Sequence, residues 1–309
     1  MGWTLLTPAT LLASMALAFG ALVTSDLGPD ETVADSIPEP VTEPVTELAT
    51  AQGSGDIETV DDLLARLEIA RSEIGTLRAD IVYTREFAIA GDTQTRIGRL
   101  YFDNRADDDD RRTRFAVRFN TLEVGDRREQ QDQIFVFDGE WLVEKVSTDR
   151  RFTKRQVAPP GSTFDPLRIG QGPFPIPLGQ KPEDIVERYN AELRPPTEGL
   201  EDTEGLSMYA ERSLVQLRLT PKPEYQDTDD FAEIRLWYDP SIAATLPKIA
   251  RTETELGDIS LVVVTNAKLN ESLPEPVFDT TTPPRSEGWN VTVSNYRQRV
   301  STGQPGGAP

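Results

Sequence analysis

Residues 77–103 read LRADIVYTREFAIAGDTQTRIGRLYFD, and this stretch decides the fold class. In its first half apolar side chains recur at every second position, which is typical of a half-buried strand. One face carries Leu77, Ala79, Ile81, Tyr83, Phe87 and Ile89, and the other carries Arg78, Asp80, Thr84 and Glu86. Gly91 and Asp92 then predict a turn into a second strand over residues 94–103. The stretch therefore predicts an antiparallel hairpin with one apolar face.

Strand signals continue from this hairpin to about Asn270. Further strands are expected over residues 112–122, 133–138, 141–147, 152–157, 213–220, 232–238, 246–256 and 259–268. Several of them alternate as the first one does, for example Phe115, Val117 and Phe119. An antiparallel meander of about ten strands must close or curl, because flat open sheets of that width are uncommon. We expect a mainly β fold with a curved antiparallel sheet.

Two segments outside the expected strands carry apolar side chains that we expect to be buried. Thr59 is placed to cap a helix whose Leu63, Leu64, Leu67, Ala70 and Ile74 fall at helical spacing. Between residues 158 and 212 a Pro-rich excursion contains Phe174, Ile176 and Leu178 between prolines, which favour an extended strip. A helix is expected from Pro182, with Ile185, Val186, Tyr189 and Leu193 on one face. The strip is either a lid over an opening or a plain connector packed on the core.

The composition excludes several classes of function. The chain has 309 residues, a net charge of −20, and neither histidine nor cysteine. It therefore has no disulfide, no thiolate nucleophile, no imidazole base and no Cys or His metal ligand. A chain this acidic is repelled by nucleic-acid phosphates. We expect no enzyme activity, no cofactor and no metal.

Two acidic groups are candidate sites for a metal ion or for catalysis. Asp107 to Asp110 are four consecutive acids without the alternating spacing of a calcium loop, and a solvated hairpin tip explains them better. Glu253 and Glu255 are spaced to share one face of a strand, as a glycosidase pair would, but a solvated face is the simpler interpretation.

The ends of the chain predict export. Residues 1–24 are uncharged and apolar, which suits a signal peptide or a membrane anchor, with a buried helix as the alternative. Residues 25–56 are acidic and Pro-rich, as in a disordered linker, and residues 301–309 have the composition of a disordered tail. This leaves residues 57–300 as one folded domain, in the periplasm if the cell has two membranes, possibly attached to the inner membrane through residues 1–24.

The order of these pieces resembles the periplasmic outer-membrane lipoprotein carriers, the LolA-like family, from Val60 to Val293. Four short matches carry the resemblance: Gly98-Arg-Leu-Tyr101, Arg111 with Phe115, Phe137-Asp-Gly-Glu-Trp-Leu142, and Val277-Phe278 followed by Pro283-Pro284 and Asn290-Val291. The resemblance implies an unclosed (half) β-barrel over short helices, with an apolar cavity that holds acyl chains. It also implies that Arg111 helps to latch a lid.

The expected site residues form two groups, an apolar lining and its lids. The apolar lining would be Ile81, Tyr83, Phe87, Phe115, Val117, Phe119, Leu217, Leu219, Ile234 and Leu236, and the lids would use Leu63, Leu67, Phe174, Ile176, Leu178 and Arg111. Periodicity alone does not distinguish a cavity from a filled sandwich core.

The function implied is a monomeric carrier that ferries acylated lipoproteins or lipids toward the outer membrane. By resemblance, its partners would be an inner-membrane lipoprotein-releasing transporter and an outer-membrane acceptor. The alternative is a membrane-tethered domain of the same fold that senses lipids or lipoproteins without transport.

Overall fold

The computed structural model describes residues 57–105, 113–157, 182–227, 229–240 and 246–296. Their helices are α1 (Val60–Glu73), α2 (Pro182–Arg188) and α3 (Glu204–Ser213), with the 3₁₀ turns η2 (Glu275–Phe278) and η3 (Arg285–Glu287). The strands are β1 (Thr76–Glu86), β2 (Thr93–Asp103), β3 (Arg114–Val124), β4 (Arg127–Phe137), β5 (Trp141–Val146), β6 (Arg151–Gln156), β7 (Tyr189–Arg194), β8 (Val215–Pro221), β9 (Glu233–Tyr238), β10 (Ile249–Glu253), β11 (Ile259–Leu269) and β12 (Asn290–Ser294). No helix among these residues is long and apolar enough to cross a membrane.

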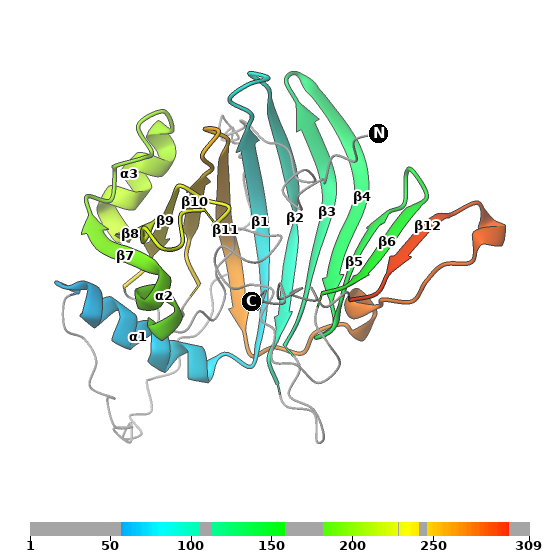
Figure 1. Cartoon of the computed structure of the whole chain (residues 1–309), viewed down its shortest axis with the longest axis horizontal. Helices are drawn as coiled ribbons and strands as arrows, with labels where there is room; N and C mark the ends of the chain where they lie inside the picture. Colours follow the sequence, from blue (N-terminus) through cyan, green and yellow to red (C-terminus); the bar gives the residue numbers. More distant parts are fainter. Residues whose placement is uncertain (1–56, 106–112, 158–181, 228, 241–245, 297–309) are drawn as a thin grey trace, which may run out of the picture. The chain divides into compact units, whose positions relative to one another are not determined.

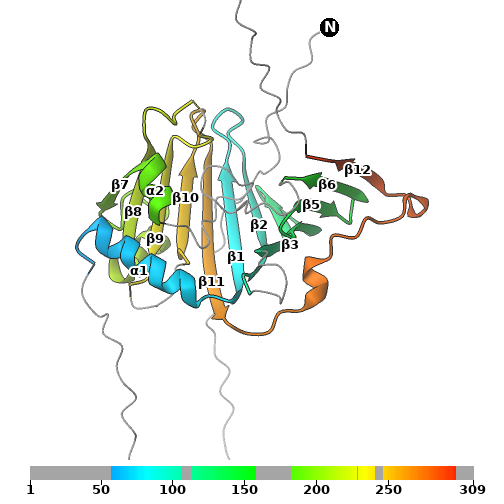
Figure 2. The same ribbon diagram turned by 60° about the horizontal axis from the view of Figure 1, so that its bottom comes forward.

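All of these strands join one sheet in the order β12-β6-β5-β4-β3-β2-β1-β11-β10-β9-β8-β7. The sheet is open, because its outermost strands β12 and β7 do not pair with each other. It bends strongly, and α1 and α2 lie on its inner side (Figures 1 and 2). The expected mainly β fold with an unclosed, curved sheet is thus confirmed. One pairing departs from the antiparallel pattern, since β12 runs parallel to β6.

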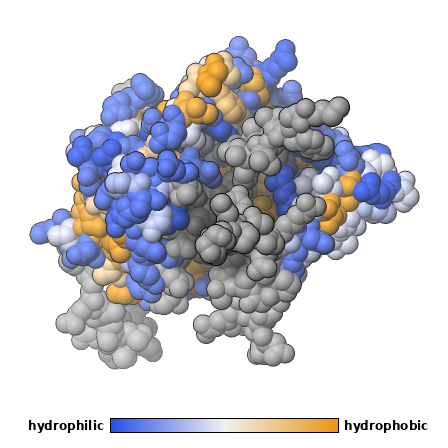
Figure 3. Space-filling model, viewed as in Figure 1, coloured by the Kyte–Doolittle hydropathy of each residue, from blue (hydrophilic) through white to orange (hydrophobic). Residues whose placement is uncertain are grey.

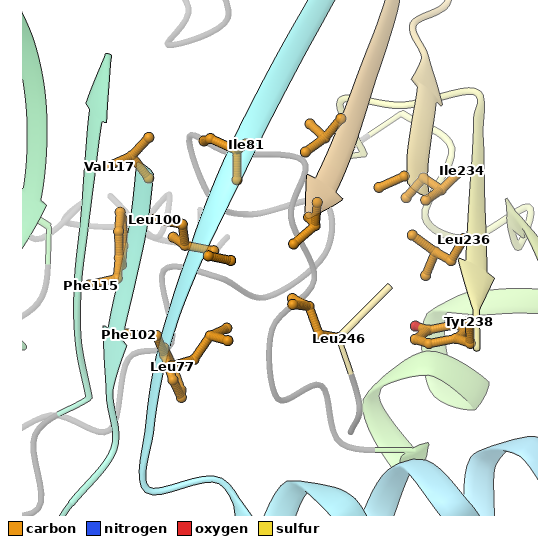
Figure 4. Packing of buried hydrophobic residues seen from close by; sticks show 14 of the residues in the cluster. Leu77, Ile81, Leu100, Phe102, Phe115, Val117, Ile234, Leu236, Tyr238 and Leu246 are labelled. Carbon is orange, nitrogen blue, oxygen red and sulfur yellow. The ribbon is translucent and has the colours of Figure 1, made fainter. Parts of the chain in front are cut away.

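The inner face of the sheet carries the main hydrophobic core. Period-two alternation puts Leu77, Ala79, Ile81 and Tyr83 of β1 on this face, with matching residues on its neighbours. Figure 4 shows these side chains gathering from strands on both sides of β1. Residues of α1 and α2 complete the cluster from above the sheet.

The outer face is covered only toward its two ends in the part of the chain that the structure describes. Toward β12, the segment that contains Leu273, Phe278 and Val291 packs on the outward side chains of β2 to β6. Toward β7, α3 packs against Trp237 and Ile249. Because both ends of the outer face are braced by local clusters, the curvature does not depend on the inner core alone.

Several elements differ from the sequence-based expectation. The helix from Pro182 ends at Arg188, and Tyr189 and Leu193 belong to β7 instead. β4 begins at Arg127, six residues before the expected Gln133, because its first half is a polar hairpin arm. α3 and β12 were not anticipated. The expected strand over residues 246–256 is shorter, spanning only Ile249–Glu253.

Candidate functional site

The candidate site is the inner face of the sheet, and nine of the ten expected lining residues meet there. They are Ile81, Tyr83, Phe115, Val117, Phe119, Leu217, Leu219, Ile234 and Leu236, all in one cluster. Each is at most 4 % exposed. The strands that carry them lie on both sides of β1, so residues about 150 apart in sequence share one apolar surface.

Phe87 is the exception among the expected lining residues. It lies just beyond the end of β1, is half-buried, and is not part of the cluster. The Arg85 guanidinium sits 4.8 Å from the centre of its ring. The strand ends at Glu86, so the alternation that was extended to Phe87 and Ile89 stops short of them.

The inner face contains more apolar residues than the ten expected from the sequence. Further members of the cluster are Leu77, Ala79, Leu100, Phe102, Phe135, Phe137, Tyr238, Leu246, Ala250, Val262 and Val264. Most of them continue the period-two pattern of strands that were predicted, so the signal was present in the sequence. Aromatic rings form part of this face. The centre of the Phe119 ring lies 6.3 Å from the ring centres of both Tyr83 and Phe135, and the ring centres of Phe115 and Phe137 are 5.8 Å apart.

Most of this face is apolar, but two buried charged groups also lie on it: Arg96 is opposite Tyr83 and 9 % exposed, and Glu144 is opposite Phe135 and 8 % exposed. The Tyr83 hydroxyl lies 3.3 Å from the Ser260 hydroxyl, and burial raises the pKa of Tyr83. Burial also raises the pKa of Tyr238. Both phenols therefore stay neutral. Among the described residues no three His, Cys, Asp or Glu side chains come together as a metal site would need. The face offers apolar contact over most of its area, and polar groups that include Arg96 and Glu144 beside Tyr83 and Phe135.

The helix α1 covers one end of this face. It begins with a capping box in which the Thr59 hydroxyl accepts from the Asp62 backbone N–H, and the Asp62 carboxylate accepts from the Thr59 backbone N–H at 3.0 Å. Leu63 and Leu67, the expected lid residues of this helix, point into the cluster and are at most 6 % exposed. The helix α1 therefore packs on the inner face of the sheet mainly through three leucine side chains, those of Leu63, Leu64 and Leu67.

Asn270 fastens the other end of α1. Its side-chain oxygen accepts from the backbone N–H of Gly75 at 2.8 Å and of Thr76 at 3.3 Å, and its amide nitrogen donates to the Glu73 carbonyl at 2.9 Å. Asn270 has a φ of +56°, a left-handed conformation that Asn adopts more readily than most residues. One side chain thus joins the last turn of α1 to the first residues of β1.

The short helix α2 is anchored by a buried ion pair. Asp229 accepts from Arg188 at 3.2 Å and from the Tyr189 hydroxyl at 2.6 Å, and its side chain is fully buried. Tyr225 packs against the Arg188 guanidinium, with 5.0 Å from the Arg188 Cζ to the ring centre. Burial and the bond to Asp229 both raise the pKa of Tyr189, which keeps it as a donor. These contacts place Ile185 in the inner cluster.

The remaining expected residues divide into two groups. Arg111, Phe174, Ile176 and Leu178, like the acidic run 107–110, lie outside the described residues. Glu253 closes β10 and pairs with Arg251 at 3.1 Å, whereas Glu255 lies in the following turn. The two glutamates do not share a strand face, so the geometry of a glycosidase pair is absent at this place.

The inner face is closed in this structure. Because its central side chains are 0–4 % exposed, a ligand reaches them only if something that covers them moves. Of the described helices, α1 and α2 are the ones that pack on this face. Each is short and each is held by a compact set of polar contacts, and such elements are suited to move as units.

Comparison with solved structures found several similar proteins. One of them, a LolA superfamily protein from Nitrosomonas europaea, is 13 % identical, with 72 % of this chain and 99 % of that chain covered at a TM-score of 0.30. A Vibrio parahaemolyticus domain assigned to outer membrane lipoprotein sorting is 12 % identical, covering 70 % of this chain and 95 % of that chain at a TM-score of 0.35.

A third similar structure is the Pseudomonas aeruginosa MucA/MucB complex, at 14 % identity over 71 % of this chain and 60 % of that chain, with a TM-score of 0.36. No protein-family model and no curated protein sequence matches the chain. At such identities and TM-scores the likeness to a LolA-like fold carries no conclusion about which ligand this chain binds.

Proposed function

We propose that this chain binds acyl chains of lipids or lipoproteins against the inner face of its sheet, and that it carries them between membranes outside the cytoplasm. The observation that carries the proposal is the extent of the apolar inner face. It runs without interruption over nine neighbouring strands, from β4 through β1 to β7. All the described strands belong to one sheet, so among the described residues no second sheet packs against this face.

The chemistry of most of the face fits an apolar ligand. The face consists mainly of aromatic and aliphatic side chains and neutral phenols, with the charged Arg96 and Glu144 beside Tyr83 and Phe135. Burial of an acyl chain contributes about 0.8 kcal/mol per methylene group, so about ten methylenes give on the order of 8 kcal/mol, near micromolar affinity. Contact with an apolar surface is therefore sufficient for binding an acyl chain, and recognition of the lipid headgroup is not required.

Access to the face requires a lid, and α1 is the described element best suited to be one. It contributes Leu63, Leu64 and Leu67 to the cluster, and it is joined to β1 at Gly75. Release of its Asn270 contacts would let the helix swing about this joint. A carrier would couple that movement to loading and delivery, with a releasing transporter and an acceptor as partners. We assign the same lid role to the residues 174, 176 and 178.

A pair of alanine variants tests where the ligand binds. Ala79 lies on the inner face of β1 and Ala116 on the outer face of β3, and both are fully buried. We expect Ala79→Leu to weaken binding of a fluorescent fatty acid several-fold, since the added atoms occupy the space that the acyl chain would take. Ala116→Leu is the matched control, because it adds the same atoms elsewhere. Equal affinity of the folded fraction in both variants would contradict the proposal.

Transport is tested separately from binding. In a two-vesicle assay, a carrier moves a labelled lipopeptide from donor to acceptor vesicles at a rate proportional to its concentration. A tethered sensor of the same fold binds the lipopeptide without raising the transfer rate. N-terminal sequencing of the exported protein adds to this, because a chain cleaved after the apolar residues 1–24 is free to diffuse whereas a retained one is not.

A further inference from the structure

Two hairpin turns lie side by side at the end of the sheet opposite to α1. They are residues 87–92, between β1 and β2, and residues 254–258, between β10 and β11. Since β1 pairs with β11 up to Glu86 and Ile259, the two turns leave the sheet at the same level. The backbone N–H of Ala88 donates to the Asp258 carboxylate at 3.1 Å, which joins the turns directly. We call this pair of turns the rim.

The rim carries the two most exposed large apolar side chains among the described residues. Ile89 is 84 % exposed and Leu256 is 71 % exposed. The two residues beside Ile89, Ala88 and Ala90, are exposed as well, so the tip of the first turn has no charged group, whereas Leu256 follows the exposed Glu255. Figure 3 shows hydrophobic surface over the tip of this hairpin, at the top of the view. Single exposed apolar residues are common on proteins, but two at adjacent apices form a shared feature.

The rim is rigid rather than loose. Arg85 and Asp258 form an ion pair at 2.8 Å, with side chains only 13 % and 17 % exposed. Asp258 also accepts from Ala88, and its own backbone N–H donates to the Thr254 hydroxyl at 3.1 Å. The side chains of Ile89 and Leu256 are therefore held out into water by a structure that fixes their backbones. Exposure that is built in this way requires an explanation.

We propose that the rim inserts Ile89 and Leu256 into the interfacial layer of a phospholipid bilayer. The shape favours a bilayer over a protein partner, because two protruding tips present far less than the roughly 800 Å² per partner of a stable protein interface. The charges around them favour a neutral bilayer, since Glu86, Asp92 and Glu255 are exposed at the same level. Insertion of apolar side chains at this depth needs no anionic lipid.

The position of the rim connects it to the inner face. Tyr83 and Ser260 lie near the ends of β1 and β11 that lead into the rim. Phe231, in the loop between β8 and β9, packs on the inner cluster from this end too. A bilayer that touches the rim would lie next to this end of the inner face, which also carries Arg85 and Arg96. The contact with lipid itself does not depend on whether an acyl chain is bound.

The test uses site-specific labels in the full-length chain. Because the chain has no cysteine, Ile89→Cys, Leu256→Cys and Val293→Cys each provide one attachment point for an environment-sensitive nitrobenzoxadiazole dye. Val293 is the matched control. It is 51 % exposed, but it lies on β12, an outermost strand of the sheet that carries neither turn of the rim. A local readout is needed because the apolar residues 1–24 give the chain a second route to a bilayer.

With phosphatidylcholine vesicles, we expect the emission of the labels at 89 and 256 to rise about threefold or more and to shift to the blue, with quenching by a lipid-borne quencher. The label at 293 should stay water-like. In the Leu256→Cys protein, the additional change Ile89→Ser should raise the vesicle concentration needed for a half-maximal fluorescence change about tenfold. This is the effect expected for removal of one inserted aliphatic side chain. The proposal is overturned if the label at 89 stays water-like, if all three labels respond alike, or if a response needs anionic lipid.

Discussion

Replacement of Asn270 by glycine tests whether α1 is a lid held at its joint with β1. Glycine accepts the φ of +56° without strain, so Asn270→Gly removes only the side chain and its three hydrogen bonds to Glu73, Gly75 and Thr76. Each such bond contributes about 1 kcal/mol net, and less where water competes, so the three together stabilise the docked helix by about 1–2 kcal/mol. The undocked population should rise about 5- to 30-fold.

The chain provides a matched control at Asn266. It also has a positive φ, of 50°, and its amide donates to Asp80 at 2.9 Å, but it does not touch α1. The entropy change of introducing glycine is therefore the same at both positions. We expect Asn270→Gly to lower the free energy of unfolding in urea by about 1 kcal/mol more than Asn266→Gly does.

The same two variants are then compared in stopped-flow binding of a fluorescent fatty acid. If α1 must open before the ligand binds, Asn270→Gly should bind about 5- to 30-fold faster and Asn266→Gly at the rate of the parent chain. Equal binding rates of the two variants, together with a clear difference in their stability, would refute the role of α1 as a lid. The contacts of Asn270 would then be structural only.

Three further predictions concern the frame that supports the site. A Cβ at Gly98 would lie 2.1 Å from a backbone carbonyl oxygen, so Gly98→Ala should destabilise the fold by about 3 kcal/mol or more in urea unfolding, whereas Gly205→Ala, with open space around it in α3, should stabilise by up to about 1 kcal/mol. Burial raises the pKa of Asp103, but the hydrogen bonds from two arginines outweigh it and lower the pKa from 3.8 to about 2. The stabilisation, on the order of 2 kcal/mol from this difference, is present above pH 4 and lost as the pH falls toward 2. Asp103→Asn should therefore flatten the stability profile in that range, and an unchanged acid slope would contradict it. Asp229→Ala leaves Arg188 buried without its partner and should cost about 3–5 kcal/mol, with loss of α2 seen by hydrogen exchange; a cost below 1 kcal/mol would show that water replaces the pair.

The sequence predicted the parts of the fold that have a strong local period. The helical spacing of Leu63, Leu64 and Leu67 corresponds to α1, and the alternation that begins at Leu77 corresponds to β1, although the strand ends at Glu86, three residues before the expected Ile89. The apolar inner face follows from the same alternation, because period two assigns each side chain to a face before the strands are arranged.

The elements that were missed lack such a signal. Tyr189 and Leu193 are four residues apart, which fits one face of a helix and one face of a strand equally well, and the structure has them in β7. β12 pairs with β6, whose partner residue Arg151 lies 139 positions before Asn290, and its exposed side chains show no alternation. The first half of β4 is polar on both faces because it extends beyond the core. In each of these cases tertiary contacts decide the structure.

The candidate site divides in the same way. Membership of the inner face was predictable for nine residues, but its limit was not, since Phe87 continues the pattern of β1 and lies past its end. The latch at Asn270 was not predictable either, because it depends on a left-handed residue at the end of β11 that meets α1 only in the folded chain. Sequence periodicity gives the surface, and long-range contacts determine how it is closed.

The central claim, that the inner face holds an acyl chain, is tested most directly by crosslinking. A fatty acid with a diazirine near its methyl end is bound to the full-length protein, activated by light, and the modified peptides are located by mass spectrometry. We expect crosslinks on Phe115, Val117, Leu217 and Leu236, and we expect an excess of unlabelled fatty acid to remove them. Crosslinks confined to outer-face residues such as Trp289, or none that the competitor removes, would contradict it.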